Sequence, residues 1–340
     1  MPRRPPKLLY LFADSPMDLF YRLRSGKNNK LLYFVNSYAH EALWHGFYRS
    51  WRSILREARR RNDFAAIMSR VNYYCKAPGP QQGNTRAVRD FGRHEAASVY
   101  YFDLHKAMRP FGPDTQMRYL PGDVTTVPLL PTLTKSRPIK GDNANSVLLK
   151  LNAIRHFISV RDTTPFSAKK DAAVFRGKVM DKPKRMDFFN RWFGHPLCDA
   201  GDTSRAAGHP EWKTDFMTIA QQLGYKFILA IEGNDVSSNL KWIMNSRSVA
   251  MMPEPEYETW FMEGRLRAGE HYIRLNSDFS DFEEVMEYYL THQAEAEAIA
   301  ANARRYCEEF HDRRREYIIS TLTVAKYLGL LDPADYQINS

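Results

Sequence analysis

Short apolar runs alternate with helical patterns in the second half of the chain. Runs typical of buried strands lie at residues 172–175, 227–231, 249–252 and 272–275. Patterns typical of helices lie at residues 184–193, 212–223, 237–245 and from 293 toward 315. Ser280 followed by Glu283 is typical of a capping box and predicts a further helix start. Strands that alternate with helices predict a parallel sheet with helices on its faces.

The first half of the chain mixes patterns typical of strands with patterns typical of helices. Strands are expected at residues 31–35 and 99–104, and an amphipathic helix is expected at 42–61. Residues 146–154 fit a helix or a strand. A loop is expected at residues 78–82, and 121–138, with four prolines, is expected to be irregular or edge-like. The polar segment 161–170 is the preferred domain junction.

Residues 225–260 contain the arrangement that points most directly to chemistry. Phe227 to Ile231 has the composition of a buried strand, and Gly233 provides the sharp turn that leaves it. Ser237 and Ser238 follow where a helix would begin, so unpaired N–H groups and the positive helix end would face the turn. Proteins with α/β folds hold phosphates in this way. An ordinary strand, turn and helix with no ligand fits the same spacing.

The same stretch resembles the core signature of glycosyltransferase family 90, the CAP10-like group of eukaryotic protein O-glucosyltransferases and bacterial lipopolysaccharide-type transferases. The matching residues are Tyr225, Lys226, Gly233, Ser237, Lys241, Ser248, Glu258, Trp260, His271, Tyr272 and the run 278–281. Upstream, Phe175, Arg176 and Gly177 followed by Arg185 resemble another family segment, as do Asp199, Ala200 and Trp212. The resemblance covers roughly residues 123–310.

The resemblance implies an α/β fold of the glycosyltransferase-B type, in which two Rossmann-like domains face a central cleft. Residues 1–160 would form the acceptor-side domain and residues 161–315 the nucleotide-sugar-binding domain. Residues 316–340 would form a helix and tail that pack back on the first domain.

Glycosyl transfer also requires that charge on a departing diphosphate be neutralised, by a metal or by cationic groups. The sequence contains no Asp-x-Asp motif, so we expect no metal and no cofactor. Arg176 follows a strand and Arg185 lies in the next helix, and both could pair with phosphate oxygens, although Arg176 also fits a structural ion pair. The resemblance adds Gly177, Gly233, Ser237, Ser238 and Lys241 to this donor site. Asn239 stands where eukaryotic relatives carry an arginine.

A base must also deprotonate the acceptor hydroxyl. The family places an aspartate in a short loop of the first domain, and Asp123 occupies the matching position. Asp142 is the rival position, and an Asp after Gly also forms ordinary turns. Asn234 and Asp235 are expected near the nucleotide or sugar, and Glu258 is expected to hydrogen-bond donor hydroxyls.

Composition limits the remaining possibilities. The 340 residues carry a formal net charge of +10, and arginines cluster at 49, 52, 56 and 59–61. This cluster (residues 49–61) suits an anionic membrane surface, a glycolipid or nucleic acid, or is a solvated helix. No nucleic-acid-binding motif accompanies it, so nucleic acid is not expected. Three widely spaced cysteines and scattered histidines indicate neither disulfides nor a zinc site. No apolar stretch is long enough to span a membrane, and residues 8–12 are too short for a signal-peptide core. We therefore expect a cytoplasmic protein, with peripheral contact at the inner face of the plasma membrane as a second expectation.

Together with the resemblance, these observations predict a metal-independent glycosyltransferase, and the resemblance implies that it inverts the configuration of the transferred sugar. Its donor would be a nucleotide sugar, expected to be a UDP-sugar, and its acceptor a carbohydrate or glycolipid such as a lipopolysaccharide core or surface polysaccharide. The alternative is a non-catalytic basic module that binds an anionic polymer, either glycan or nucleic acid.

Overall fold

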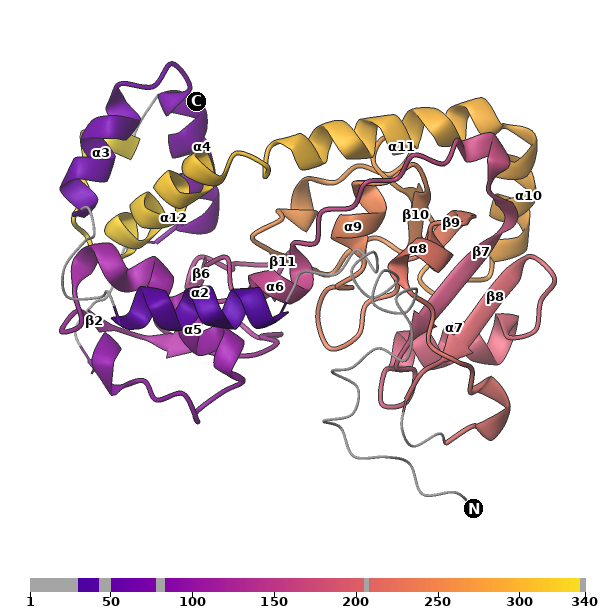
Figure 1. The fold of residues 1–340 in the computed structure, drawn as a ribbon, viewed down its shortest axis with the longest axis horizontal. Helices are drawn as coiled ribbons and strands as arrows, with labels where there is room; N and C mark the ends of the chain where they lie inside the picture. Colours follow the sequence, from indigo (N-terminus) through magenta and orange to yellow (C-terminus); the bar gives the residue numbers. More distant parts are fainter. Residues whose placement is uncertain (1–29, 43–49, 78–82, 205–207, 337–340) are drawn as a thin grey trace.

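The structure is a computed structural model that describes residues 30–42, 50–77, 83–204 and 208–336. Two parts, each built around a parallel sheet, lie side by side (Figure 1). The larger sheet belongs to the second half of the chain, and the smaller sheet to the first half together with the C-terminal helix α12 (Arg313–Tyr327).

Five parallel strands form the larger sheet. Their order is β12 (Ile273–Arg274), β10 (Val249–Met252), β9 (Tyr225–Leu229), β7 (Lys170–Gly177) and β8 (Cys198–Asp202). From β7 the chain adds β8 on one side and β9 on the other. The order of the strands therefore reverses between β7 and β9, and ligands of open α/β sheets bind outside the carboxyl ends of strands at such a point.

Both faces of this sheet are covered by helices, as a parallel sheet requires. Phe175, Phe227 and Met251 face a core with α7 (Pro183–Trp192), α10 (Phe282–Thr291) and α11 (Gln293–Glu308). Val174 and Ile228, the sequence neighbours of Phe175 and Phe227, face the core on the other side of the sheet, with α8 (Ile219–Gln222) and α9 (Leu240–Met244). The strands are apolar on both faces, which explains their continuous rather than alternating pattern.

The smaller sheet consists of β3 (Tyr119–Leu120), β4 (Thr132–Thr134) and β6 (Ser146–Leu148), all parallel. Leu133 and Val147 pack with α5 (Ser98–Met108) and with α12. Helix α12 also contacts α3 (Trp51–Arg59) and α4 (Phe64–Tyr74). The remaining elements are α2 (Lys30–Ala42), β1 (Arg86–Ala87), β2 (Gln116–Met117), α6 (Ala153–His156), α13 (Pro333–Tyr336) and five short 3₁₀ turns within the described residues.

One pair of strands joins the two parts. Strand β5 (Ser136–Pro138) pairs antiparallel with β11 (Tyr257–Thr259), which follows β10 in the larger part. At the centre of this pair, Arg137 forms a buried ion pair with Glu258, with 2.7 Å between Nε and Oε1. The two parts therefore share backbone hydrogen bonds as well as side-chain contacts.

The strand and helix predictions for the second half are largely confirmed, with two corrections. A helix, α10, does begin at Phe282 as expected, but the Ser280–Glu283 capping box is wrong, because Ser280 donates to Asp278 and α10 has no side-chain cap. A capping box does form at Thr218 and Gln221. It starts helix α8 at Ile219, so the helix expected from residue 212 is much shorter than predicted.

The first half departs further from expectation. Residues 31–35 and 99–104, expected as strands, lie in helices α2 and α5. In α5 the buried Tyr100, Leu104 and Met108 are spaced by four residues, a helical period that a six-residue window does not reveal. Residues 132–134, expected to be irregular or edge-like, form the central strand of the smaller sheet.

The α/β class with parallel sheets is confirmed, whereas the glycosyltransferase-B arrangement and the domain boundaries stay predictions. Within the described part of the chain, no helix is both long enough and apolar enough to cross a membrane. Of the basic cluster, Arg59 pairs with Asp335 and Arg61 with Asp63. Arg49, the loop at 78–82 and residues 1–29 lie outside the described residues.

Candidate active site

Arg185 lies at the point where the strand order reverses. Its Nη1 donates to the carbonyl of Lys178, just after β7, at 2.8 Å. Its Nε and Nη2 donate to the carbonyl of Ile231, just after β9, at 3.1 and 2.9 Å. The guanidinium therefore spans the carboxyl ends of the two strands, where the fold favours ligand binding.

One glycine makes room for this guanidinium. A Cβ on Gly233 would lie 3.1 Å from Arg185 Nη2, whereas a Cβ on Gly177 would make its tightest contact with the Phe175 ring, at 3.0 Å. Neither glycine has a positive φ. Gly233 therefore serves close approach to Arg185 rather than a backbone conformation reserved for glycine.

Asp123 extends from the smaller sheet to the turn after β9, which contains Gly233, Asn234 and Asp235. It lies in the loop after β3, 111 residues from Asn234, whose Nδ2 donates to Asp123 Oδ2 at 3.0 Å. The other carboxylate oxygen forms an ion pair with Lys135. The structure thus brings the expected base and the expected donor turn into direct contact.

Lys135 links Asp123 to a second carboxylate. Its ammonium lies 2.6 Å from Asp235 Oδ2, and the exposed fractions of the Lys135 and Asp235 side chains are 2% and 4%. Burial opposes ionisation of Asp123, but Lys135 and Asn234 outweigh it and hold the pKa of Asp123 below its ordinary value. Burial raises the pKa of Asp235 despite the nearby ammonium.

Further cations surround the turn. Lys182 Nζ contacts Asn234 Oδ1, and Arg155 on α6 acts electrostatically on both Asp123 and Arg185. Burial, followed by repulsion from Arg155, lowers the pKa of Arg185 to about 10. Within the described ranges, no carboxylate lies within 4.0 Å of Lys182, Arg155 or Arg185. These three cations therefore form no direct ion pair with a described residue, although Asp202 attracts Arg185 and Arg155 attracts Asp123 over longer distances.

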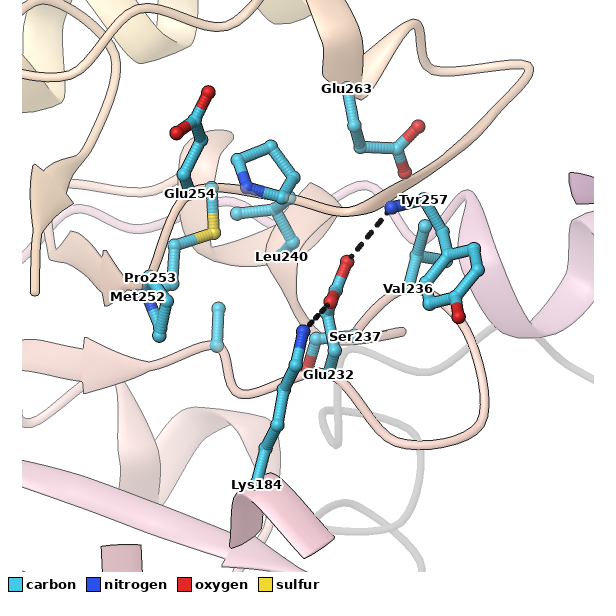
Figure 2. A pocket seen from close by; sticks show the side chains of 12 residues that line it. Lys184, Glu232, Val236, Ser237, Leu240, Met252, Pro253, Glu254, Tyr257 and Glu263 are labelled. Atoms are coloured by element: carbon cyan, nitrogen blue, oxygen red, sulfur yellow. Dashed lines mark hydrogen bonds and ion pairs between the residues drawn. The ribbon is translucent and has the colours of Figure 1, made fainter. Parts of the chain in front are cut away.

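A narrow pocket opens beside the turn, at the carboxyl ends of β9 and β10. Figure 2 shows Lys184 reaching from α7 to Glu232, which in turn accepts from the backbone of Tyr257 at 3.2 Å. The other lining residues are Ala230, Val236, Ser237, Leu240, Met252, Pro253, Glu254, Pro255 and Glu263. The walls are therefore mainly apolar, with the carboxylates of Glu232, Glu254 and Glu263 spread among them.

Arg176 lies apart from this centre. Its Nη2 pairs with Asp199 Oδ1 at 2.6 Å, and its Nη1 donates to the Asp199 carbonyl at 2.7 Å. Asp199 pairs in register with Val174, two residues before Arg176, so the guanidinium turns back along the sheet. This geometry agrees with the structural ion pair that the sequence left open.

Glu258 and Lys241 are also engaged elsewhere. Glu258 is buried on Arg137 and also accepts from Tyr73, and Lys241 is buried on Glu263, with 2.5 Å between Nζ and Oε1. In this structure neither side chain faces the turn.

The serines stand outside the helix that they were expected to begin. Helix α9 starts at Leu240, and its first flanking residue, Asn239, provides no side-chain cap. Ser237 donates to Asn239 Oδ1 at 2.5 Å and lines the pocket, while Ser238 is half-buried. Asp142, the rival base, accepts from the backbone of Ala144 at 3.0 Å, as a turn-forming residue does.

Two comparisons with known proteins decide the family. The sequence profile described as glycosyl transferase family 90 matches residues 147–327. The chain is 42% identical over 271 residues to the O-glucosyltransferase LpsA of Dichelobacter nodosus, covering 79% of this chain and 85% of that protein. The chain belongs to glycosyl transferase family 90. It is therefore a glycosyltransferase, and the non-catalytic basic module is wrong as a description of it.

Three residues of this candidate site were not predicted from the sequence: Lys135, Lys182 and Arg155. Lys182 stands in the basic run 182–185 that opens the helix after β7, a visible signal of a cationic helix start. Lys135 gave no such signal, because the burial of residues 132–137 becomes evident only in the structure. Arg155 gave no signal in the sequence either.

Metal use in this family 90 protein stays a prediction. Among the residues that the structure describes, no group of three or more His, Cys, Asp or Glu side chains gathers in a way that could hold a metal ion. The cationic groups at the turn offer another way to neutralise a diphosphate.

Proposed function

We propose that this protein transfers a glucosyl residue from a UDP-sugar to a hydroxyl of a carbohydrate acceptor, with inversion and without a metal. The acceptor would be a lipopolysaccharide core or a related surface glycan. The observation that carries the proposal is the contact between Asp123 and Asn234 at the carboxyl end of the sheet, beside Arg185. A base and an anion site are the two groups that this reaction needs close together.

The proposed step is a single displacement. Asp123 accepts the proton of the acceptor hydroxyl while the oxygen of that hydroxyl forms a bond to the anomeric carbon of the donor sugar. The bond between that carbon and the diphosphate oxygen breaks, and its electron pair leaves with UDP. Arg185, supported by Lys182 and Arg155, offsets the charge that develops on the diphosphate. Attack opposite the leaving group inverts the configuration.

The pocket beside the turn lies where the fold would place a nucleoside, but it has room for only about one water molecule, so its walls would have to move apart for a nucleoside to enter. Its apolar residues can pack against a flat base, and the Glu254 and Glu232 carboxylates can accept hydrogen bonds from ribose hydroxyls. In the proposed glycosyltransferase-B arrangement the acceptor enters from the side of Asp123, between the two parts. The name of the Dichelobacter nodosus relative supports glucosyl transfer.

A donor-binding panel tests this proposal. Thermal unfolding is followed with UDP-, GDP-, CDP- and dTDP-sugars, each with and without EDTA. A ligand at 100 times its Kd adds about 2.7 kcal/mol of stability, so a bound donor is readily detected. We expect stabilisation by UDP and UDP-glucose that EDTA leaves unchanged. Loss of the shift in EDTA would overturn metal independence, and a shift with another nucleotide alone would overturn the UDP assignment.

A further inference from the structure

Lys135 is buried where the two parts of the molecule meet. It lies between β4 and β5, and its ammonium contacts Asp123 of the first half and Asp235 of the turn after β9. A buried ammonium is costly unless paired, and here two carboxylates from distant segments share it. Asp123 and Asp235 thus meet through one cation.

The contacts also restrict the orientation of Asp123. Lys135 binds Oδ1, and the amide of Asn234 binds Oδ2 at 3.0 Å. Asn234 and Asp235 are adjacent in the donor turn, so both contacts tie the Asp123 carboxylate to the same turn. The side chain remains 30% exposed, and a carboxylate has about four acceptor positions, so it can still accept a proton.

We infer that Lys135 is a positioning residue that holds the Asp123 carboxylate, ionised, against the donor turn. The inference rests on the proposed function, in which Asp123 is the base. Lys135 itself touches neither the acceptor nor the donor.

The expected consequence is a change in pH dependence. A base acts in its ionised form, so activity is lost as the pH falls through its pKa. An aspartate has an ordinary pKa near 3.9, and the pKa of Asp123 lies below its ordinary value. The wild-type rate should therefore have no acid limb between about pH 5 and 8. Removing an opposite charge within about 4–6 Å raises a carboxylate pKa by about 1–3 units. Arg155, which also lowers the pKa of Asp123, remains in such a variant, and the nearby Asp235 carboxylate opposes ionisation of Asp123. The limb should therefore move to between about pH 4 and 7, and the profile must extend down to about pH 4.

The test is the pH profile of kcat/KM for Lys135→Met, with Lys135→Arg as the charge-preserving variant. We expect Lys135→Met to show an acid limb displaced upward by at least about one pH unit. Lys135→Arg should restore the wild-type profile in part. If Lys135→Met instead lowers kcat/KM by the same factor at every pH, with no shift of the acid limb, Lys135 has a merely structural role and the inference is overturned.

A double variant keeps the test decisive if Lys135→Met does not fold. That variant leaves Asp235 buried without its cation, so Lys135→Met/Asp235→Asn removes both charges. Because the Asp235 carboxylate itself opposes ionisation of Asp123, the reference for the double variant is Asp235→Asn alone. The double variant should fold and show its acid limb at a higher pH than Asp235→Asn, whereas equal limbs in these two variants would contradict the inference. Full activity of Asp123→Asn would instead defeat the proposed function itself. An inactive Asp123→Asn with an unshifted Lys135→Met would defeat only the role of Lys135.

Discussion

At the scale of single residues, the site is defined by which charges are paired and which are not. Arg176, Glu258 and Lys241 each have a buried or half-buried partner of opposite charge. In the ranges that the structure covers, Arg185 donates only to carbonyl oxygens. An arginine bound only to neutral acceptors keeps its charge available for an anionic ligand.

Asp123→Asn should abolish transfer and preserve donor binding. The amide cannot accept the acceptor proton, and general bases contribute about 10²–10⁴ in rate, so we expect kcat to fall by at least about 10². Radiolabelled transfer measures the rate, and calorimetric titration with UDP measures binding. Turnover close to that of the wild type would remove Asp123 from the proposed mechanism.

Arg185→Lys should weaken UDP binding because lysine cannot reproduce the planar set of donors. We expect Kd to rise by at least about tenfold, or 1.4 kcal/mol. Arg191→Lys is the matched control, because it lies on the same helix and its side chain is 48% exposed. Equal affinities for the two variants in calorimetric titration would show that Arg185 does not bind the diphosphate.

At the scale of elements, the turn after β9 depends on its fit to α7. Arg185 comes from the first turns of α7 and spans the ends of β7 and β9, so the helix start and both strand ends are fixed together. Gly233 lies against the guanidinium with little space to spare. The turn is thus shaped by a neighbouring helix and not by its own sequence alone.

Gly233→Ala should therefore affect donor binding more than folding. The added Cβ would lie 3.1 Å from a guanidinium that three hydrogen bonds hold in place, so Arg185 must move. We expect a several-fold rise in the Kd of UDP, about 1 kcal/mol, with a small change in Tm. The control is Gly92→Ala, whose Cβ would meet only Glu95 at 3.7 Å. The explanation fails if the two variants bind UDP equally.

The elements also show what a sequence can and cannot predict. The strands at 172–175 and 227–231 were recognised because burial on both faces gives unbroken apolar runs. Residues 99–104 were mistaken for a strand because their helical spacing of four emerges only over eleven residues. The family resemblance pointed to Asp123, but its contact with Asn234 spans 111 residues and leaves no local pattern. Lys135 was missed for the same reason.

At the scale of the whole molecule, α12 connects the two parts. Its Glu316 pairs with Arg70 of α4 at 2.7 Å and with Lys150 at 2.8 Å. It also accepts from the indole of Trp260, just beyond β11, at 2.7 Å. One buried carboxylate therefore gathers groups from both halves of the chain.

Glu316→Gln should destabilise the protein strongly. Removing one partner of a buried pair typically costs about 3–5 kcal/mol, because the remaining Arg70 charge is left uncompensated. Glu308→Gln on the exposed side of α11 is the control and should change stability by less than about 0.5 kcal/mol. Urea unfolding measures both, and similar midpoints would contradict the assigned role of Glu316.

The β5–β11 pair has a consequence for protein engineering. Donor and acceptor preferences of two-part transferases invite the exchange of whole halves between relatives. Here a transplanted segment 161–315 would bring Glu258 and leave Arg137 behind in the host chain. A different residue at either position would leave a buried charge without its partner between β5 and β11. Chimaeras should therefore carry residues 136–138 together with the grafted half, so that β5 and β11 come from the same parent protein.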